Sequence, residues 1–446
     1  MKRNIYFIGI GGIGMSALAF YFMEMGDKVY GYDLTPSPIT DQLIAKGAEI
    51  HFEENIEKIP KKVDLVVYTP AVSQNHAEYQ YFLKQQIPVF KRSEILGQLS
   101  SEKPTIAVAG THGKTTTTAL ATHLLYPEYP VTAFIGGVAK NFDSNYVISP
   151  NSEIVVVEAD EYDRSFLTLS PSVAIITSMD ADHLDIYHGK TNLEEAFQCF
   201  ADKILPNGTL VIHEDIADQI EHPSKITYGF SENADCRAGE IVLYPNRITF
   251  DLHYRNSYYP QLELGITGRY NLLNALAAIA ALFAAYPQKE KQEMLPFLQK
   301  LKTFQGVKRR FDYQIYTDQL IYIDDYAHHP HEISSFLKSV KMLFPEKSLT
   351  AVFQPHLYSR TRDFADEFAR SLELADKIIL LDIYPAREEP IAGVSSAWLL
   401  SLIQKEDKRL LSKEELIPFL QKAKPEVLVT IGAGDIDRLV PILLQK

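Results

Sequence analysis

Short apolar runs alternate with stretches of helical periodicity along most of this chain. Near the N-terminus, apolar residues fill 5–10, a helix-like stretch covers 15–25, and a second apolar run covers 29–32. Further runs at 65–68 and 88–90 continue the alternation. Apolar runs bounded by turn residues are typical of buried strands, and strands that alternate with helices form parallel sheets. The pattern predicts an N-terminal α/β domain.

The alternation starts again at two later points. The apolar run 105–109 opens a central α/β unit, which an Ala-rich helix at 271–285 closes. Residues 225–266 differ, because short alternating strands separated by Asn, Gly and Pro predict antiparallel strands appended to the central sheet. Other predicted strands are 154–157, 173–177, 321–324, 349–353, 377–382 and 427–431.

Two segments are predicted linkers. Residues 100–104 are polar and end in proline, and residues 302–308 precede the last α/β stretch. A chain of 446 residues is too long for one core, since domains cluster near about 100 to 150 residues. We therefore expect three domains, at 1–103, 104–305 and 306–446.

Composition narrows the functional classes. The chain is 46% hydrophobic and 23% charged, as in soluble globular proteins, and its net charge of −13 argues against an extended nucleic-acid surface. Cys199 and Cys236 cannot form a disulfide framework, which favours a reducing cytoplasm. No stretch approaches the roughly 18 to 20 apolar residues of a membrane span, and glycines interrupt the apolar run after Lys2 and Arg3, so we expect neither membrane insertion nor a signal peptide.

A first glycine-rich loop follows the first predicted strand. Residues 9–14, Gly-Ile-Gly-Gly-Ile-Gly, match G-x-G-x-x-G, and Asp33 follows about twenty residues on. Such glycines let a diphosphate approach backbone N–H groups at a helix start, and Asp33 could accept from a ribose hydroxyl. The motif fits a dinucleotide or a UDP-sugar, and an empty strand-to-helix turn is the weaker alternative.

A second loop carries the stronger signal. Residues 110–115, Gly-Thr-His-Gly-Lys-Thr, follow the apolar run 105–109 and enter a Thr-rich helix start. Backbone N–H groups would surround phosphate oxygens, Lys114 would bind the β and γ phosphates, and the Thr115 hydroxyl would ligate magnesium. The sequence predicts a nucleoside triphosphate site here.

Carboxylates follow two strands of the same unit. Glu158 ends the run 154–157, and His183 lies among aspartates after the run 173–177. Hard cations prefer oxygen ligands, so Glu158 is the better magnesium candidate, and His183 is a candidate for a second ion. A solvated acidic loop is the alternative for each, but two such loops in one phosphate-binding unit favour metal binding.

Eight strings, in order over essentially the whole chain, resemble the Mur ligases of bacterial peptidoglycan synthesis. Each alone is weak evidence, but together they are specific. The strings are GIGGIGMS (9–16), GTHGKTTT (110–117), EADEYD (158–163), DHLDIY (182–187), NLLNALAA (271–278), GVKRRF (306–311), DDYAHHP (324–330) and FQPHLYSRTRD (353–363).

The resemblance implies a Rossmann-like UDP-sugar domain, a central P-loop ATPase domain with appended antiparallel strands, and a C-terminal Rossmann-like α/β domain that binds an amino acid. It implies a cytoplasmic ligase, monomeric or homodimeric, that uses ATP and Mg²⁺ to join L-alanine to UDP-N-acetylmuramate. In the family, ATP phosphorylates the muramyl carboxylate, and the amine attacks the resulting acyl phosphate.

Site residues are carried over from the matching strings. The resemblance assigns catalysis to Lys114, Glu158, His183 and Arg310, and metal binding to Thr115, Glu158 and His183. ATP would be bound by Gly110, Thr111, His112, Gly113, Lys114, Thr115, Thr116, Asn271, Asn274, Arg310 and Asp325. The UDP-sugar would be bound by Gly11, Gly12, Ile13, Gly14, Ser16, Asp33 and Ser73, and the amino acid by Tyr326, His328 and Arg360.

Two positions depart from the family pattern, and three other functions stay open. Leu357 stands where many relatives have Arg, and Tyr270 stands where His is common. A recycling ligase of the same family would add a tripeptide in place of L-alanine. An NAD-dependent oxidoreductase would explain the first loop only, and a nucleotide-dependent switch would explain the second loop only.

Overall fold

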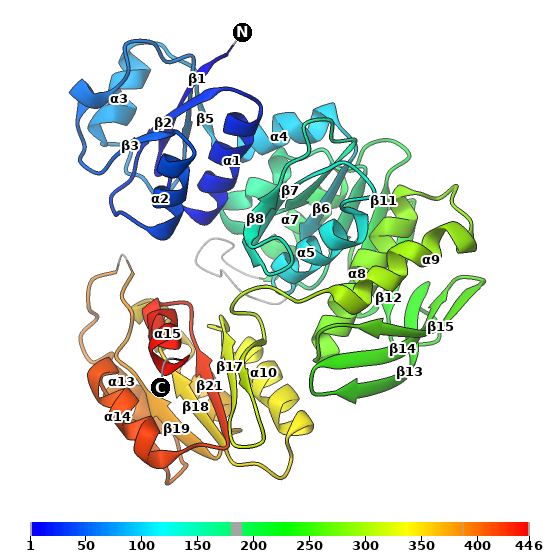
Figure 1. Cartoon of the computed structure of the whole chain (residues 1–446), viewed down its shortest axis with the longest axis vertical. Helices are drawn as coiled ribbons and strands as arrows, with labels where there is room; N and C mark the ends of the chain where they lie inside the picture. The colour runs from blue at the N-terminus through cyan, green and yellow to red at the C-terminus, as the bar shows by residue number, and fades with distance from the viewer. Residues whose placement is uncertain (1, 180–189, 387, 445–446) are drawn as a thin grey trace. The chain divides into compact units, whose positions relative to one another are not determined.

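The computed structural model describes residues 2–179, 190–386 and 388–444 and divides the chain into two compact units (Figure 1). The first unit contains a five-stranded and a ten-stranded sheet, and the second contains a six-stranded sheet. The first unit comprises Met1–Val242, Arg247–Ile266 and Tyr270–Gln305, and the second comprises Leu243–Asn246, Thr267–Arg269 and Gly306–Lys446. The predicted α/β class is confirmed.

The N-terminal sheet is parallel in the order β3-β2-β1-β4-β5. Alternate residues of β1 face opposite layers: Phe7 shares a core with Leu18 of α1, whereas Tyr6 shares another with Phe82 of α3. Burial on both faces explains the continuous apolar run. The elements are β1 (Asn4–Ile8), α1 (Ile13–Glu24), β2 (Lys28–Tyr32), α2 (Pro38–Ala45), β3 (Glu49–His51), η1 (Ile56–Lys58), β4 (Leu65–Tyr68), α3 (Ala77–Lys84), β5 (Val89–Lys91) and α4 (Arg92–Glu102).

The central sheet has the order β15-β14-β13-β12-β11-β10-β6-β9-β7-β8. Every residue of β6 is buried, because parallel neighbours and helices cover it. Its strands are β6 (Thr105–Ala109), β7 (Val131–Ala139), β8 (Ser144–Val147), β9 (Ile154–Glu158), β10 (Val173–Ile176), β11 (Thr209–His213), β12 (Lys225–Gly229), β13 (Cys236–Tyr244), β14 (Arg247–Tyr254) and β15 (Ser257–Leu264). Its helices are α5 (Lys114–Leu125), η2 (Tyr162–Thr168), α7 (Lys190–Ala201), η3 (Glu214–Gln219), α8 (Arg269–Ala285), α9 (Lys291–Gln299) and η4 (Lys300–Thr303).

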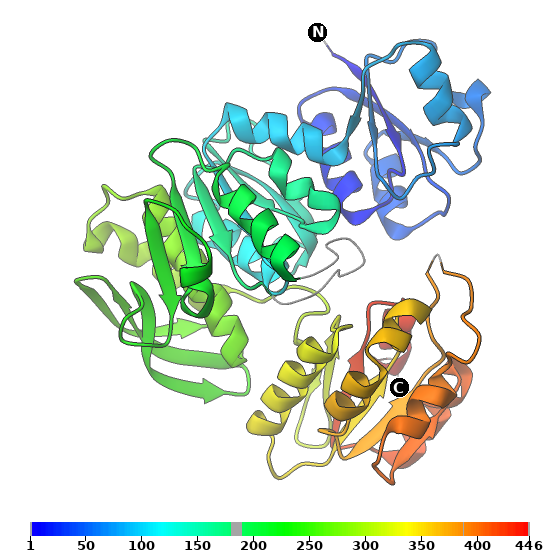
Figure 2. The ribbon, with the colours of Figure 1, turned by 180° about the vertical axis from the view of Figure 1, so that it is seen from behind.

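The appended antiparallel strands are shorter than the sequence predicted. β14 and β15 form the expected antiparallel pair, which projects from the end of the central sheet in Figures 1 and 2. However, β12 pairs parallel with β11 and with the start of β13. Residues 225–229 therefore extend the parallel sheet, because the buried side chains of Ile226 and Tyr228 pack between two parallel neighbours.

The second unit is a mixed sheet with helices on both faces. Its order is β16-β17-β21-β18-β19-β20, with β16 antiparallel to β17 and the others parallel. α10 and α12 pack together, and α14 and α15 share a core on the other face (Figures 1 and 2). The elements are β16 (Asp312–Tyr316), β17 (Ile321–Asp325), α10 (Pro330–Leu343), β18 (Leu349–Phe353), α11 (Tyr358–Asp363), α12 (Ala365–Leu372), β19 (Lys377–Leu380), α13 (Ser396–Leu402), β20 (Lys408–Leu410), α14 (Lys413–Ala423), β21 (Val427–Ile431), η5 (Asp435–Leu439) and α15 (Val440–Leu444).

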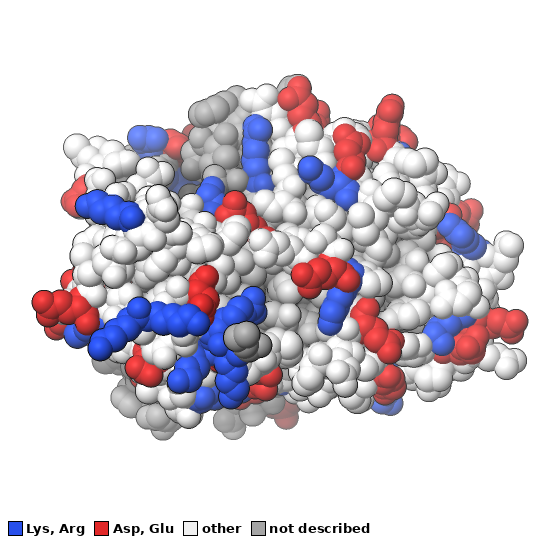
Figure 3. All heavy atoms as spheres, turned by 90° about the horizontal axis from the view of Figure 1, so that it is seen from above, with Lys and Arg blue, Asp and Glu red and all other residues white. Residues whose placement is uncertain are grey.

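The charged surface and the lengths of the helices can be described for the residues that the structure covers. Basic and acidic side chains are interspersed on the face drawn in Figure 3. Within the described residues, no helix combines the length and apolarity needed to cross a membrane. We keep 1–103, 104–305 and 306–446 as proposed domain limits, which fall between α4 and β6 and between η4 and β16.

Candidate active site

The loop at 110–113 connects β6 to α5 and has a conformation that requires glycine at two positions. Gly110 has φ +129° and Gly113 has φ +83°, both in the region that disfavours other residues. Space is also restricted, because a β-carbon on Gly110 would lie 2.1 Å from Thr177 Oγ1. A β-carbon on Gly113 would lie 2.4 Å from Asn274 Oδ1. The loop therefore approaches α8 closely and leads into the N-terminus of α5.

The Lys114 side chain folds back over this loop. Its amine donates to Gly110 O at 2.7 Å and to Glu161 Oε1 at 2.8 Å. Burial lowers the pKa of Lys114, but the carboxylates of Glu161, Asp160 and Glu158 outweigh burial and raise the pKa overall. Lys114 is thus a buried, protonated amine at the phosphate loop. A phosphate arriving there would compete with Glu161 for it.

The two candidate oxygen ligands for a divalent cation, Thr115 and Glu158, lie side by side. Thr115 Oγ1, in the first turn of α5, donates to Glu158 Oε1 at 3.1 Å. The second carboxylate oxygen, Oε2, accepts from the Gly136 backbone at 2.8 Å, which orients Glu158. A hydroxyl and a carboxylate are the donor set that Mg²⁺ takes together with phosphate oxygens and water. The two residues therefore fit a magnesium site.

The remaining loop residues hold the loop against the end of β10. Thr111 N donates to Ser178 O at 3.1 Å, and His112 N donates to Ser178 Oγ at 2.9 Å. Thr116 is buried in α5. His183, the candidate second metal ligand, lies outside the described residues.

The two asparagines at the start of α8 lie next to the loop. Asn271 and Asn274 are 2% and 8% exposed, and Asn274 Nδ2 donates to Asn271 Oδ1 at 3.4 Å. Asn274 Oδ1 is the atom that a side chain at Gly113 would strike. The structure thus brings both predicted adenine-binding residues to the phosphate loop, although Asn274 lies 161 positions after Gly113 in the sequence.

In the N-terminal sheet, Asp33 binds the first glycine loop itself. Its Oδ2 accepts from Gly11 N at 2.6 Å, and its Oδ1 accepts from Thr35 N at 3.2 Å. A β-carbon on Gly11 would lie 2.9 Å from Asp33 Oδ2. The carboxylate therefore fixes the loop at the end of β1, and its predicted contact with a ribose stays a prediction.

The other predicted UDP-sugar residues surround the same strand ends. Gly12 is the N-cap of α1, Ile13 and Gly14 begin the helix, and the Ser16 hydroxyl donates to Ile13 O at 3.0 Å. Ser73 is exposed in the loop after β4, where its hydroxyl accepts from Asn75 N at 3.1 Å. β1 and β4 are parallel neighbours, so the two loops meet at one edge of the sheet.

In the second unit, the residues after β17 form a second cluster. Asp325 accepts from Phe311 N at 2.7 Å and from Ala327 N at 2.8 Å. Burial raises its pKa to about 7, against the lowering effects of Arg310 and of the two hydrogen bonds. The Arg310 guanidinium lies 4.9 Å from the centre of the Tyr326 ring. The structure therefore brings Arg310 and Asp325, predicted to bind the nucleotide, next to Tyr326, predicted to bind the amino acid, and these roles stay predictions.

Of the two other predicted amino-acid-binding residues, His328 lies beside Tyr326, whereas Arg360 belongs to a separate element. His328 Nδ1 lies 3.1 Å from Tyr326 O and 3.4 Å from Glu332 Oε2. Arg360 stands in α11, the short helix after β18. Leu357, the departure noted in the sequence, is the N-cap of α11 with φ +69°.

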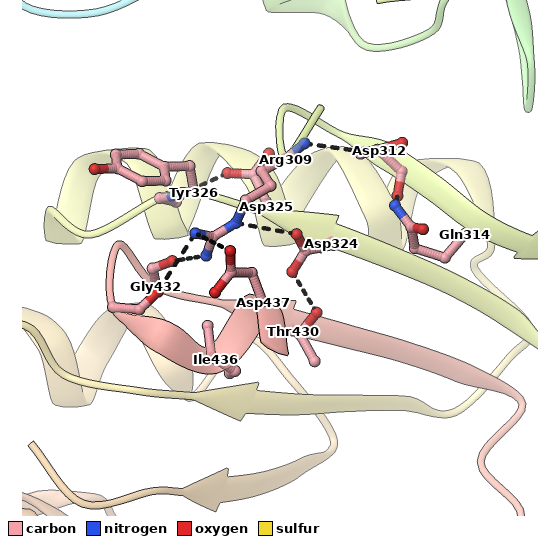
Figure 4. A network of polar contacts seen from close by, with 12 residues as sticks. Arg309, Asp312, Gln314, Asp324, Asp325, Tyr326, Thr430, Gly432, Ile436 and Asp437 are labelled. Carbon is pink, nitrogen blue, oxygen red and sulfur yellow. Dashed lines mark hydrogen bonds and ion pairs between the residues drawn. The ribbon is translucent and has the colours of Figure 1, made fainter. Parts of the chain in front are cut away.

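Two residues that sequence reasoning did not assign organise the second unit. Arg309 reaches between β17 and the turn after β21, where it pairs with Asp324 at 3.2 Å and Asp437 at 3.6 Å (Figure 4). Glu388 accepts from the backbone and hydroxyl of Ser359 at the start of α11. The Arg309-Arg310 pair in the sequence was a signal that one arginine could be structural, but the sequence could not say which. Nothing local signalled Glu388.

Three family profiles match the chain in sequence. The profile described as "Mur ligase family, catalytic domain" matches residues 4–104, "Mur ligase middle domain" matches 108–282, and "Mur ligase, glutamate ligase domain" matches 309–434. Together they cover most of the chain and include the phosphate loop, Glu158 and the cluster around Tyr326.

Full-length relatives extend these matches. A UDP-N-acetylmuramate–L-alanine ligase of Flavobacterium psychrophilum is 47% identical over 98% of this chain and 96% of its own length. Among solved structures, a UDP-N-acetylmuramate-alanine ligase of Thermotoga maritima is 28% identical with a TM-score of 0.81, covering 99% of this chain and 98% of that one. A murein peptide ligase of Psychrobacter arcticus, 23% identical with a TM-score of 0.70 over 99% and 98%, shares the fold.

Proposed function

Because this chain belongs to the Mur ligase family, we propose that it joins L-alanine to the carboxylate of UDP-N-acetylmuramate at the expense of ATP, in peptidoglycan synthesis. The observation that carries the substrate assignment is the 47% identity, end to end, with a ligase of that name. Site geometry supports the reaction class, because a phosphate loop and a pair of magnesium ligands meet at one end of α5.

ATP binds at the loop 110–116. Backbone N–H groups in the first turn of α5 face the phosphates, and Lys114 leaves Glu161 to bind the β and γ phosphates. Thr115 and Glu158 would hold Mg²⁺, and the ion would neutralise phosphate charge. The family resemblance assigns a second ion to His183, and it assigns contacts with the nucleotide to Asn271 and Asn274 of the first unit and to Arg310 and Asp325 of the second.

UDP-N-acetylmuramate binds the first glycine loop through Gly11, Gly12, Ile13, Gly14 and Ser16, with Asp33 and Ser73 on the neighbouring loops. L-alanine binds near Tyr326, His328 and Arg360 of the second unit. We place the enzyme in the cytoplasm, as a monomer or homodimer.

The reaction has two steps. The γ-phosphoryl group passes from ATP to a carboxylate oxygen of the muramyl group, giving ADP and an acyl phosphate. The neutral amine of L-alanine then attacks the acyl carbon, the C–N bond forms, phosphate leaves, and the nitrogen loses one proton. Such phosphoryl transfer depends on positioning and charge neutralisation, so it requires no protein nucleophile, and the positive charges of Lys114 and Arg310 are the groups that we assign to it.

An assay of phosphate release tests this proposal. We expect release only when ATP, Mg²⁺, UDP-N-acetylmuramate and L-alanine are all present, with mass spectrometry identifying UDP-N-acetylmuramoyl-L-alanine. Release stimulated by a murein tripeptide and not by L-alanine would instead establish the recycling ligase. A rise in the melting temperature with NAD, together with no change on adding UDP-N-acetylmuramate, would contradict both the L-alanine ligase and the recycling ligase.

A further inference from the structure

Arg92, the first residue of α4, packs its guanidinium directly against the first glycine loop. A β-carbon on Gly14 would lie 2.8 Å from Arg92 Nη1 and 3.0 Å from Arg92 Cζ. The φ angle of Gly14 is not positive, so its backbone conformation does not require glycine. Glycine is needed here because a side chain would clash with Arg92. The third glycine of the motif therefore makes room for an arginine head group beside the first turn of α1.

The position of α4 is fixed by its contacts with the central sheet. Gly97 approaches η2 so closely that a β-carbon there would lie 2.5 Å from Thr168 O. The Thr168 hydroxyl donates to Ser93 O at 2.8 Å, one residue after Arg92. α4 lies between the two sheets of the first unit in both Figure 1 and Figure 2. Arg92 is thus anchored at the junction of the N-terminal and central sheets.

The glycine loop is anchored to the same sheet from the other side. Asn145 of β8, 6% exposed, donates through its side chain to Ile13 O. The rings of Phe20 in α1 and Tyr146 in β8 stack at 4.6 Å between centroids. The loop, Arg92 and the end of β9 therefore belong to one packed unit.

Arg92 is a half-buried cation beside this loop. It lines a small cavity together with Glu158 and Asp160, at the end of β9. Among the residues that the structure describes, its guanidinium makes no hydrogen bond or ion pair, in contrast to Arg309 with its two carboxylate partners. A guanidinium presents five N–H donors, and leaving them unsatisfied in a partly buried place is costly unless an anion completes the site.

We propose, building on the function proposed above, that Arg92 binds the diphosphate of the UDP-sugar. The planar guanidinium matches phosphate oxygens with two parallel N–H donors, and it lies against Gly14, where the diphosphate would meet the backbone of the glycine loop. The diphosphate is favoured over the muramyl carboxylate because the guanidinium contacts the glycine loop itself. In this position Arg92 would hold UDP-N-acetylmuramate beside the cavity that Glu158 also lines.

Calorimetric binding of uridine, UDP, UDP-N-acetylglucosamine and UDP-N-acetylmuramate to the full-length protein tests this assignment. For Arg92→Ala we expect the Kd of the three diphosphates to rise about 10- to 100-fold, the range for loss of a charge-assisted pair. Arg92→Lys should show a smaller rise, because an ammonium lacks the paired donors. Gly14→Ala should weaken the same three ligands by displacing the guanidinium. Uridine binding and the KM for ATP should not change.

Lys61→Ala is the matched control. Lys61 is exposed and precedes β4, so it lies at the edge of the parallel sheet opposite the glycine loop, and its loss changes net charge equally. Circular dichroism confirms that each variant is folded. Unchanged Kd values in Arg92→Ala, or weakening confined to UDP-N-acetylmuramate, would overturn the diphosphate assignment. Failure of the unmodified protein to bind any UDP ligand would overturn the proposed function, and this assignment with it.

Discussion

Arg309 Nε lies 3.2 Å from Asp324 Oδ2, and the Thr430 hydroxyl donates to the other oxygen of the same carboxylate at 2.6 Å. The Asp324 side chain is 1% exposed and that of Arg309 is 19% exposed, so this is a largely buried pair that links β17 to β21. Arg309 also donates to Gly432 O in the turn after β21 (Figure 4). This network fixes the backbone next to Arg310 and Tyr326.

Arg309→Ala should destabilise the second unit by about 3 to 5 kcal/mol, because it leaves a buried carboxylate without its partner. Thermal and urea unfolding measure the loss. Arg370→Ala is the control, since Arg370 is 71% exposed in its pair with Glu367 and should contribute under about 1 kcal/mol. Equal effects of the two substitutions would contradict the structural role of Arg309.

Gly113→Ala should impair both stability and nucleotide binding. Gly113 has φ +83°, and a β-carbon would lie 2.4 Å from Asn274 Oδ1, so the loop or α8 must move. Gly47→Ala isolates the backbone effect, because Gly47 has φ +103° but nothing within 4 Å of the added carbon. We expect Gly47→Ala to cost about 1 to 2 kcal/mol with no change in the KM for ATP. Gly113→Ala should cost more and raise that KM, as steady-state kinetics would show.

Asp325 should make the second unit less stable as pH rises from about 4 to 7. Its folded pKa of about 7 lies above the ordinary aspartate value of 3.8, so between these two values the folded state keeps a proton that the unfolded state releases. The difference of about 3 pKa units corresponds to at most about 4 kcal/mol. Below pH 4 and above pH 7 this contribution is constant.

Asp325→Asn removes this titration. Asn loses part of the acceptor capacity toward Phe311 N and Ala327 N, so the variant should be less stable than the parent at pH 4. Its deficit should shrink between pH 4 and pH 8 as the parent loses stability. Urea unfolding of both proteins across this range gives the difference, and a deficit independent of pH would contradict the raised pKa.

Glu158→Gln should lower kcat by about 100-fold or more, because a magnesium ligand loses its charge while its shape is kept. The amide can still accept from Gly136 N, so the fold should be unaffected. We expect partial rescue at high Mg²⁺ concentration and an unchanged KM for UDP-N-acetylmuramate. Glu153→Gln, which alters a carboxylate just before β9, is the control and should behave as the parent. Full activity of Glu158→Gln at low Mg²⁺ would exclude the metal role.

Local sequence was sufficient for most of the buried parallel strands, whose apolar runs reflect burial on both faces, and glycines marked both loops because β1 and β6 must turn sharply into α1 and α5. The sequence analysis did not predict the edge strands β3, β8, β16 and β20, nor β7 and β11. The direction of β12 was also wrong, because sequence alternation suggested an antiparallel strand. Neighbours in the sheet, which the local pattern does not record, decided its direction.

The phosphate loop, Glu158 and the order of the family motifs were all readable from the sequence, since each depends on residues close together along the chain. Only the tertiary structure decided which charges meet. In the folded chain Lys114 pairs with Glu161 and Arg309 pairs with Asp324, while the Arg92 guanidinium packs against Gly14. Parallel topology brings strand ends that are distant in the sequence to one edge of a sheet. Charged side chains that are buried there lose their hydrogen bonds to water and must pair with whichever groups the fold places beside them.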